Sequence, residues 1–302
     1  MNFSPLTPED YPRLKPFFAG GGRRLSAYCL PSLIAWSRCF EETSFAVEDD
    51  ALFVREVHLQ DPGHKHLLLP VRPRGAPEPS VLREKVEAAG LREYHFVPED
   101  YLQAHGRGKV EECFTVQEQP EYEDYVYRTS DLASLTGRDY AKKRNLVRQF
   151  EREFAERGTV RVGEMSRGRL GDCLECLEGW RRENPEKEGA TLLECERKAI
   201  TQTLAYFDAL EFRGIRVEVE GRTRGFAIAA RLSDDTGALC FEKASDKVKG
   251  LYQFLDREAA RRLFTDLPWI NKESDLGDPG LAKAKQSYHP ALRLKSYKLT
   301  AR

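Results

Sequence analysis

The alternation of residues between positions 215 and 229 is the feature that most restricts the fold of this chain. Ile215, Val217 and Val219 alternate with charged side chains, and after a turn at 221–225 the chain returns through the apolar segment 226–229. A period of two residues places alternate side chains on opposite faces of a strand. A slip of one residue would turn the apolar set toward solvent, so the register is well specified. We therefore expect a β-hairpin with one buried face.

A crossover follows this hairpin. A third strand is expected at 239–243, and a helix over 250–264, apolar on one side, leads to a short apolar strand at 269–271. A helix between two strands of one sheet implies a parallel connection. The sheet should therefore be mixed.

The first part of the chain predicts a similar order of helices and strands. The acidic segment 118–123, with Pro120, is typical of a boundary. We therefore predict an α/β protein with mixed sheets and two domains, residues 1–120 and 121–302. The order of elements resembles that of a GNAT-type acyltransferase domain, so we expect two GNAT-like units in tandem. The other expected elements are helices at 7–18, 33–40, 80–89, 98–104, 139–157, 169–183 and 194–210, and strands at 44–47, 51–54, 67–69, 93–97 and 113–117.

Charge and hydropathy argue against two classes of protein. The 302 residues include 48 basic and 49 acidic side chains, a formal net charge of -1, so no overall charge attracts nucleic acid or an anionic membrane. No aromatic stacking platform is evident either, so a nucleic-acid-binding protein has little support. No apolar run approaches the roughly 20 residues that span a bilayer, and the N-terminus lacks the pattern of a signal peptide. We expect a cytoplasmic protein without a transmembrane segment.

The seven cysteines are scattered along the chain, which favours reduced thiols over a disulfide framework. Cys173 and Cys176 form a C-x-x-C pair, but it lies in an expected helix, and Cys195 stands alone. A structural zinc site needs four ligands. We therefore expect thiols packed in the core and no metal site.

Polar side chains gather where the strand at 269–271 ends. Asn271, Lys272, Glu273 and Asp275 come first, and a Gly-Asp-Pro-Gly loop leads to a Lys-rich helical turn closed by Pro290. A strand fixes the positions of polar groups while the following loop leaves them open to a ligand. The alternative is an ordinary strand end with solvated charges.

A basic helix start is a second candidate site. Lys142, Lys143, Arg144 and Asn145 lie where backbone N–H groups also favour anions. Lys143 projects in line with the apolar stripe of its helix, so it must reach solvent or meet an anion. The alternative is a solvated basic face.

The loop before the helix at 250–264 is a third candidate. GNAT enzymes cradle the pyrophosphate of coenzyme A on backbone amides at the corresponding place. Lys247 and Gly250 fit the first two positions of their usual pattern, and Tyr252 occupies the position where Gly or Ala is usual. This departure puts coenzyme A binding in doubt.

Motifs over residues 124–290 resemble the phosphatidylglycerol lysyltransferase C-terminal-like family, and the N-terminal half, with Trp36, is similar more loosely. The resemblance implies tandem GNAT-like domains, related to the soluble catalytic part of lysyl-phosphatidylglycerol synthase and more distantly to Fem-type transferases, which move an aminoacyl group from a charged tRNA. Two departures are the missing membrane-spanning part and Lys272, where related enzymes often carry Arg. The motifs are 124–127, 135–138, 142–145, 241–244, 250–252 and 271–277, with Leu281, Lys283, Ala284, Lys285, Ser287, Tyr288 and Pro290.

Together these observations predict an acyl- or aminoacyl-transferase with one cleft between the strands ending at Lys243 and Asn271. The donor would be aminoacyl-tRNA or a coenzyme A thioester, and the acceptor an amine or hydroxyl on a small molecule, peptide or lipid. Transfer needs a base and donors for the oxyanion. The alternatives are structural ion pairs at these positions, a bonded core tyrosine, and a non-catalytic module that binds an acylated or nucleotide-like ligand. The candidate residues are Glu273, Asp275 and Tyr288 for catalysis, Glu242, Lys243, Asn271, Lys272 and Lys285 for substrate binding, and Lys142, Lys143, Arg144, Asn145, Lys247, Gly250 and Tyr252 for the donor phosphates.

Overall fold

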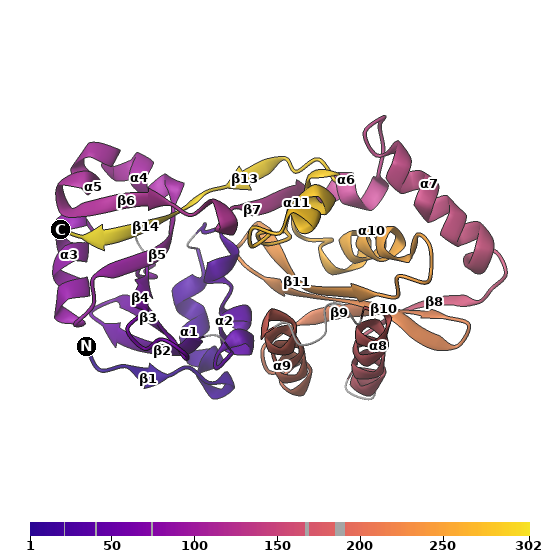
Figure 1. The fold of residues 1–302 in the computed structure, drawn as a ribbon, viewed down its shortest axis with the longest axis horizontal. Helices are drawn as coiled ribbons and strands as arrows, with labels where there is room; N and C mark the ends of the chain where they lie inside the picture. Colours follow the sequence, from indigo (N-terminus) through magenta and orange to yellow (C-terminus); the bar gives the residue numbers. More distant parts are fainter. Residues whose placement is uncertain (21, 40, 74, 167–168, 185–190) are drawn as a thin grey trace.

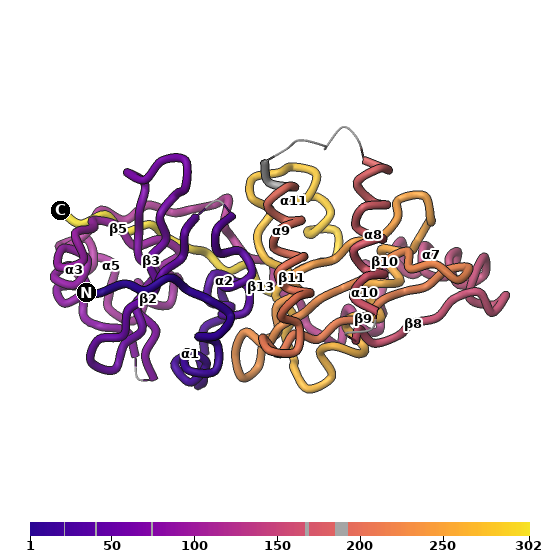
Figure 2. Tube along the Cα trace, turned by 90° about the horizontal axis from the view of Figure 1, so that it is seen from below, coloured from indigo at the N-terminus to yellow at the C-terminus, as the bar shows by residue number. Residues whose placement is uncertain are grey.

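A computed structural model of the protein describes residues 1–20, 22–39, 41–73, 75–166, 169–184 and 191–302. The described chain forms two lobes side by side, each built around a mixed seven-stranded sheet, and both termini lie in the first lobe (Figure 1, Figure 2).

The first sheet has the strand order β1-β2-β3-β4-β5-β14-β6. Its strands are β1 (Ser4–Pro5), β2 (Glu41–Glu48), β3 (Ala51–His58), β4 (Lys65–Leu68), β5 (Glu93–Pro98), β6 (Phe114–Glu118) and β14 (Ser296–Ala301). The helices of this lobe are α1 (Tyr11–Phe18), α2 (Leu30–Trp36), α3 (Pro79–Ala88), α4 (Glu99–His105) and α5 (Arg107–Cys113), with short 3-10 turns at Pro8–Asp10, Ser26–Tyr28 and Pro120–Tyr122.

The second sheet has the order β13-β7-β12-β11-β10-β9-β8. Figure 1 shows α10 on one face of this sheet and α8 and α9 on the other. The strands are β7 (Asp124–Arg128), β8 (Val160–Glu164), β9 (Arg213–Val219), β10 (Arg222–Arg231), β11 (Thr236–Ala244), β12 (Trp269–Asn271) and β13 (Leu292–Leu294). The helices are α6 (Thr129–Ser134), α7 (Ala141–Phe150) with a π-helical turn at Glu151–Ala155, α8 (Leu170–Glu183), α9 (Thr191–Ala205), α10 (Leu251–Leu263) and α11 (Pro279–Gln286).

The same connection between strands occurs in both sheets. In the second sheet β9, β10 and β11 are antiparallel, α10 crosses over, and β12 lies parallel to β11. In the first sheet β2, β3 and β4 are antiparallel, α3 crosses over, and β5 lies parallel to β4. The predicted hairpin is the β9–β10 pair, and Ile215 and Val217 on its apolar face are fully buried. The predicted α/β architecture of two tandem GNAT-like units with mixed sheets is therefore confirmed.

The last strand of the chain does not join the sheet that precedes it in sequence. Tyr297 of β14 is paired with Val97 on β5 and with Glu118 on β6, both in the first sheet. The predicted range 121–302 thus includes a strand that belongs to the first sheet. Strand pairing at this distance leaves no signal in the local pattern of β14.

A disulfide corrects the expectation that every cysteine is reduced. Cys39, just after α2, is bonded to Cys195 of α9, and Gln202 of α9 also donates a hydrogen bond to the carbonyl of Ile34. The two lobes are thereby linked covalently. Cys173 and Cys176 are buried free thiols, and burial raises the pKa of each to about 12, as expected for core packing.

None of the helices in the described residues is both long and apolar enough to cross a membrane.

Candidate functional site

The parallel strands β11 and β12 diverge beyond a short paired segment. Their register runs from Thr236 opposite Trp269 to Ala238 opposite Asn271. Strand β11 then continues to Ala244, whereas the N–H of Lys272 bonds to the carbonyl of Tyr125 on the other neighbour, β7. The polar residues at the ends of both strands lie around this divergence.

The predicted single cleft is divided between the two faces of the sheet. Adjacent residues of a strand point to opposite faces, and the contacts of Glu242 and Lys243 follow that rule. Glu242 bonds to Lys272 on the face covered by α10, whereas Lys243 pairs with Glu196 of α9 on the other face. Lys272 and its neighbour Glu273 are separated in the same way, since Lys272 contacts Asp256 of α10 and Glu273 lies near Glu196 of α9.

On the α10 face, Lys272 lies at the centre of a buried cluster, which we call the Lys272 cluster and which comprises Glu242, Asp256, Lys272, Tyr288 and Lys143. Lys272 Nζ donates to Glu242 Oε2 at 3.2 Å and forms an ion pair with Asp256. The ring centre of Tyr288 lies 3.8 Å from Lys143 Nζ and 5.2 Å from Lys272 Nζ, both cation–π contacts. The structure therefore brings together residues from β11, α10, α7 and the segments after β12 and α11.

Burial shapes the electrostatics of this cluster. Burial, with the charge of Asp256 added, raises the pKa of Glu242 to about 7. Burial alone would lower the pKa of Lys272, but Asp256 and Glu242 hold it above its ordinary value. Burial and the same two carboxylates raise the pKa of Tyr288 well above its usual range. Glu242 Oε1 is buried and accepts no hydrogen bond from the described residues, so one acceptor of the cluster is unused.

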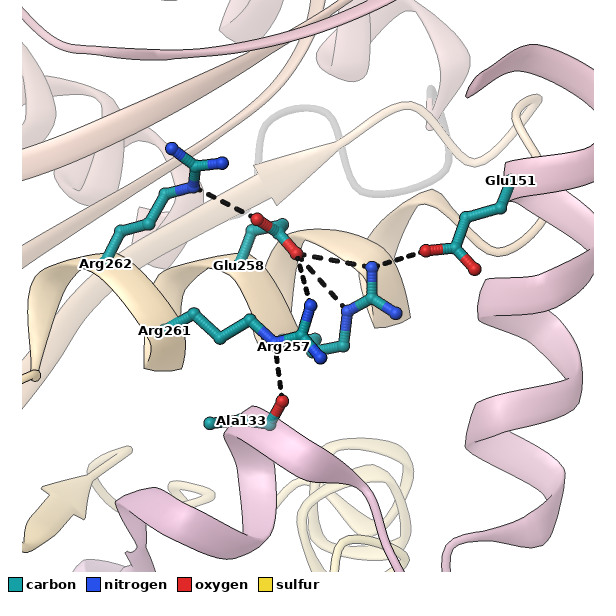
Figure 3. A network of polar contacts seen from close by, with 6 residues as sticks. All are labelled: Ala133, Glu151, Arg257, Glu258, Arg261 and Arg262. Atoms are coloured by element: carbon teal, nitrogen blue, oxygen red, sulfur yellow. Dashed lines mark hydrogen bonds and ion pairs between the residues drawn. The ribbon is translucent and has the colours of Figure 1, made fainter. Parts of the chain in front are cut away.

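A second network of polar contacts joins α10 to its neighbouring helices (Figure 3). Glu258, buried on α10, accepts from Arg262 Nε at 3.0 Å and forms ion pairs with Arg257 and Arg261. Arg257 also pairs with Glu151, which follows α7, at 2.6 Å, and Arg261 donates to the carbonyl of Ala133 in α6 at 2.7 Å. The helix that carries Asp256 is therefore tied to its neighbours on both sides.

The opposite face of the sheet carries Glu273, Lys243, Glu196 and Trp180, which we call the Glu273 face. Lys243 Nζ lies 2.9 Å from Glu196 Oε2 and 4.2 Å from the ring centre of Trp180. Burial raises the pKa of Glu273 to about 8, although the charge of Lys285 partly opposes this. Glu273 also has a φ of 59°, the left-handed region that costs free energy for a residue other than glycine. A half-buried carboxyl with a near-neutral pKa is thus held in a strained loop.

The other residues predicted at this strand end hold the loop. Lys285 Nζ donates to the carbonyls of residues 272, 273 and 274 at 2.6, 3.1 and 2.6 Å. Asp275 accepts from the hydroxyl of Tyr125 at 2.6 Å and from the N–H of Gly277 at 2.9 Å. Both oxygens of Asp275 and all three protons of the Lys285 ammonium are therefore engaged within the protein.

Asn271 joins the two lobes. Its side-chain amide donates to Asp124 Oδ2 and to the carbonyl of Arg24, each at 2.7 Å, and Asp124 also accepts from Ser26 of the first lobe. Asn271 is fully buried. The amide thus positions the end of β12 against the first lobe.

The basic helix start of α7 contributes one residue to the Lys272 cluster. Lys143 Nζ donates to Ser287 Oγ at 2.7 Å, and burial lowers the pKa of Lys143. Arg144 donates to the carbonyls of Leu135 and Gly137 and so closes the preceding loop. Lys142 and Asn145 are exposed.

The loop before α10 is packed tightly. Gly250 has a φ of 83°, and a Cβ at this position would lie 2.2 Å from the carbonyl oxygen of Leu146 in α7. Tyr252, in the first turn of α10, is half-buried and packs against the core between this helix and the sheet, and burial raises the pKa of its hydroxyl. Lys247, by contrast, has a side chain that is 76% exposed.

A cavity of about 350 Å³ lies elsewhere, between α1 and the ends of β10 and α10. Tyr11, Phe18, Leu232 and Phe264 form part of its wall, and none of the predicted site residues lines it. Four charged side chains in its wall, Lys15, Glu211, Arg213 and Arg231, are held in ion pairs within the protein, so we place the site at the divergence of β11 and β12.

Sequence reasoning missed two acidic partners. Asp256 stands directly after the buried Leu255 in α10, and a buried acid on the apolar side of a helix was the available signal. Glu196 on α9 pairs with Lys243 on β11, which follows in sequence only after β9 and β10, and the pattern of α9 gives no indication of that contact.

Comparison with known proteins supplies the family. A family model described as "Phosphatidylglycerol lysyltransferase, C-terminal" matches residues 77–300. The chain belongs to this phosphatidylglycerol lysyltransferase C-terminal family. The predicted resemblance is therefore confirmed. The match to this family model, which is described as a transferase, extends from the residues just before α3 to the last strand. No curated protein matches the chain.

Solved structures similar to this member of the lysyltransferase C-terminal family share its two-lobed fold. A conserved protein of unknown function from Bacteroides thetaiotaomicron VPI-5482 is 27% identical, with a TM-score of 0.89 and 100% of both chains covered. The C-terminal domain of a putative lysylphosphatidylglycerol synthetase from Agrobacterium fabrum is 14% identical, with a TM-score of 0.63 and coverage of 97% of this chain and 92% of that one. FemX is 10% identical, with a TM-score of 0.54 and coverage of 98% and 97%. The last two likenesses concern the fold alone.

Proposed function

We propose that this protein transfers an acyl or aminoacyl group from a phosphate-bearing donor to an amine or hydroxyl, with the reaction centre on the Glu273 face. The observation that carries this proposal is Glu273 itself. It is a half-buried carboxyl at the divergence of β11 and β12, with a pKa raised by burial to about 8, in a chain whose family is a transferase family. A carboxyl of that pKa suits proton transfer near neutral pH.

The roles of the side chains follow from their contacts. The acceptor amine or hydroxyl attacks the carbonyl carbon of the donor and gives its proton to Glu273. We assign to Lys243, on the same face, the stabilisation of the negative charge that develops on the carbonyl oxygen. Collapse of the intermediate breaks the bond to the donor oxygen or sulfur, and Glu273 returns the proton to that leaving group.

The remaining candidates support this centre. Asp275 and Lys285 hold the loop that carries Glu273, since their polar atoms are bonded within the protein. Tyr288 belongs to the Lys272 cluster, on the face of the sheet opposite to Glu273, so we assign it a positioning role. The Lys272 cluster fixes the end of β12 from the other face.

As the donor we propose aminoacyl-tRNA in preference to a coenzyme A thioester. The Tyr252 side chain packs against the core, and Gly250 is pressed against α7, which disfavours a phosphate cradle at that loop. The exposed Lys142, Asn145 and Lys247 are left to contact phosphates. The same closed loop is the observation that favours the second candidate function, a non-catalytic module that binds an acylated or nucleotide-like ligand.

A transfer assay separates these functions. The purified protein is incubated with labelled aminoacyl-tRNA or labelled acetyl-coenzyme A and a panel of amines, peptides and phosphatidylglycerol vesicles. We expect transfer from aminoacyl-tRNA, and a loss of about 100-fold or more in kcat for Glu273→Gln. Glu220→Gln, at an exposed position, serves as the control. Binding of aminoacyl-tRNA without transfer from any donor would support the binding module instead.

A further inference from the structure

A second group of chemically active side chains lies in the first lobe, outside the site described above. Glu41 on β2, Glu56 on β3 and His66 on β4 come from three neighbouring strands. Glu56 is paired directly with His66 and with Thr43, two residues after Glu41. Since directly paired residues, and residues two apart, share a face of a sheet, all three side chains lie on one face.

We propose that Glu41, Glu56 and His66 bind a divalent transition-metal ion such as Zn²⁺. The ligand atoms, one from each residue, all lie within 4.8 Å of one another, and His66 Nε2 is 3.2 Å from Glu56 Oε2. Zinc–ligand bonds of about 2.0–2.2 Å place tetrahedral ligands about 3.3 Å apart. The Glu56–His66 pair already has that spacing, and rotation of the half-buried Glu41 side chain closes the rest.

The composition of the group selects the kind of ion. One imidazole and two carboxylates form a nitrogen and oxygen ligand set, which suits Zn²⁺ and similar ions, whereas Mg²⁺ and Ca²⁺ prefer oxygen alone. Three protein ligands leave one position of a tetrahedral zinc ion for water.

The surroundings favour a cation rather than an ordinary ion pair. Glu56 and His66 are buried, with exposed fractions of 8% and 5%. No Lys or Arg in the described part of the chain forms a salt bridge with Glu41 or Glu56, so the basic groups beside these two carboxyls are the imidazoles of His66 and of His58, which lies opposite Glu41 on β3. Buried charges are usually paired or coordinate metals.

Neighbouring side chains fix the orientation of the imidazole. The ring of His66 is stacked on His95 of β5, with ring centres 3.9 Å apart, and the edge of Phe96 packs against it at 5.8 Å. His95 in turn bonds to Glu93 at 3.1 Å. An oriented imidazole loses little freedom when it binds an ion, which is how outer contacts support metal ligands.

The simplest alternative is a proton shared between the two carboxyl groups. Burial raises the pKa of Glu41 to about 8, and the charge of Glu56 adds to this rise. In that case the cluster has no preference for zinc, and neutralising Glu41 leaves metal binding unchanged.

The proposal is tested by calorimetric titration with ZnCl2. The protein is first treated with EDTA to remove bound metal, and the EDTA is then removed. We expect one zinc ion per chain, with an affinity at least 10-fold lower in Glu41→Gln and in Glu56→Gln. Glu42→Gln is the matched control, because Glu42 is the exposed neighbour on the same strand. His64→Ala is a second control, because His64 lies in an exposed turn beside Asp61.

X-ray absorption at the zinc edge should show nitrogen and oxygen neighbours only. Absence of zinc binding, equal affinity in Glu41→Gln and the wild type, loss of binding in His64→Ala, or sulfur among the zinc neighbours would each overturn the proposal. Circular dichroism confirms that each variant is folded. If Glu56→Gln unfolds, the half-buried Glu41 still provides the test.

Discussion

Replacing Lys272 by methionine tests whether the Lys272 cluster is a buried ion-pair site. Lys272 Nζ is bonded to Glu242 and Asp256, whose side chains are only 15% and 6% exposed. Methionine keeps most of the volume of the side chain and removes the charge. Removing one partner of a buried ion pair costs about 3–5 kcal/mol, because the remaining charge is left without compensation. We expect a loss of that size in the free energy of unfolding at pH 8.

The loss should depend on pH in a defined direction. Burial already raises the pKa of Glu242 to about 7, and without the lysine the pKa rises further. A carboxyl whose pKa is higher in the folded protein than in the unfolded chain destabilises the fold as pH rises above the unfolded value near 4.5. In Lys272→Met this penalty is present at pH 8 and shrinks toward pH 5, where Glu242 is protonated.

Urea denaturation followed by circular dichroism at pH 5 and pH 8 measures both effects. Lys283→Met is the matched control, since Lys283 is exposed on α11 and its loss should change the free energy of unfolding by less than about 0.5 kcal/mol. The double variant Glu242→Gln with Lys272→Met should recover part of the stability at pH 8. A loss below about 1 kcal/mol, or one equal at both pH values, would refute the reasoning.

Three further predictions concern other parts of the chain. Gly250→Ala should destabilise the protein by more than about 1 kcal/mol, because Gly250 has a φ of 83° and the new Cβ would meet the carbonyl of Leu146. Gly108→Ala is the control, since a Cβ at Gly108 meets free space, and thermal unfolding compares the two variants. Cys39→Ser should lower the free energy of unfolding by about 2–5 kcal/mol, measured without reductant, and a dithiothreitol-treated wild type should match it. If transfer activity is found, kcat/KM should rise with pH through a pKa near 8 as Glu273 loses its proton, and a profile that Glu273→Gln leaves unchanged would assign the base elsewhere.

The residue pattern determined the sheets and much of the neighbourhood of the site. Alternation from Ile215 to Val219 fixed which face of β9 is buried, and the crossover helix before β12 fixed the parallel pair. The polar run after Asn271 marked the strand end where the Lys272 cluster and the Glu273 face lie. These features are local, so a period of two or of 3.6 residues is sufficient to predict them.

The tertiary structure decided which of the predicted residues meet. The sequence alone determined that Glu242 and Lys243 are neighbours on a strand, but only the packing of α10 and α9 on opposite faces brought Asp256 close to Glu242 and Glu196 close to Lys243. Likewise, the pairing of β14 with the first sheet, the Cys39–Cys195 bond and the meeting of Glu41, Glu56 and His66 join residues far apart in the chain. Such contacts depend on how whole elements pack, because the free energy that fixes them comes from burial shared across lobes and strands rather than from any short stretch of residues.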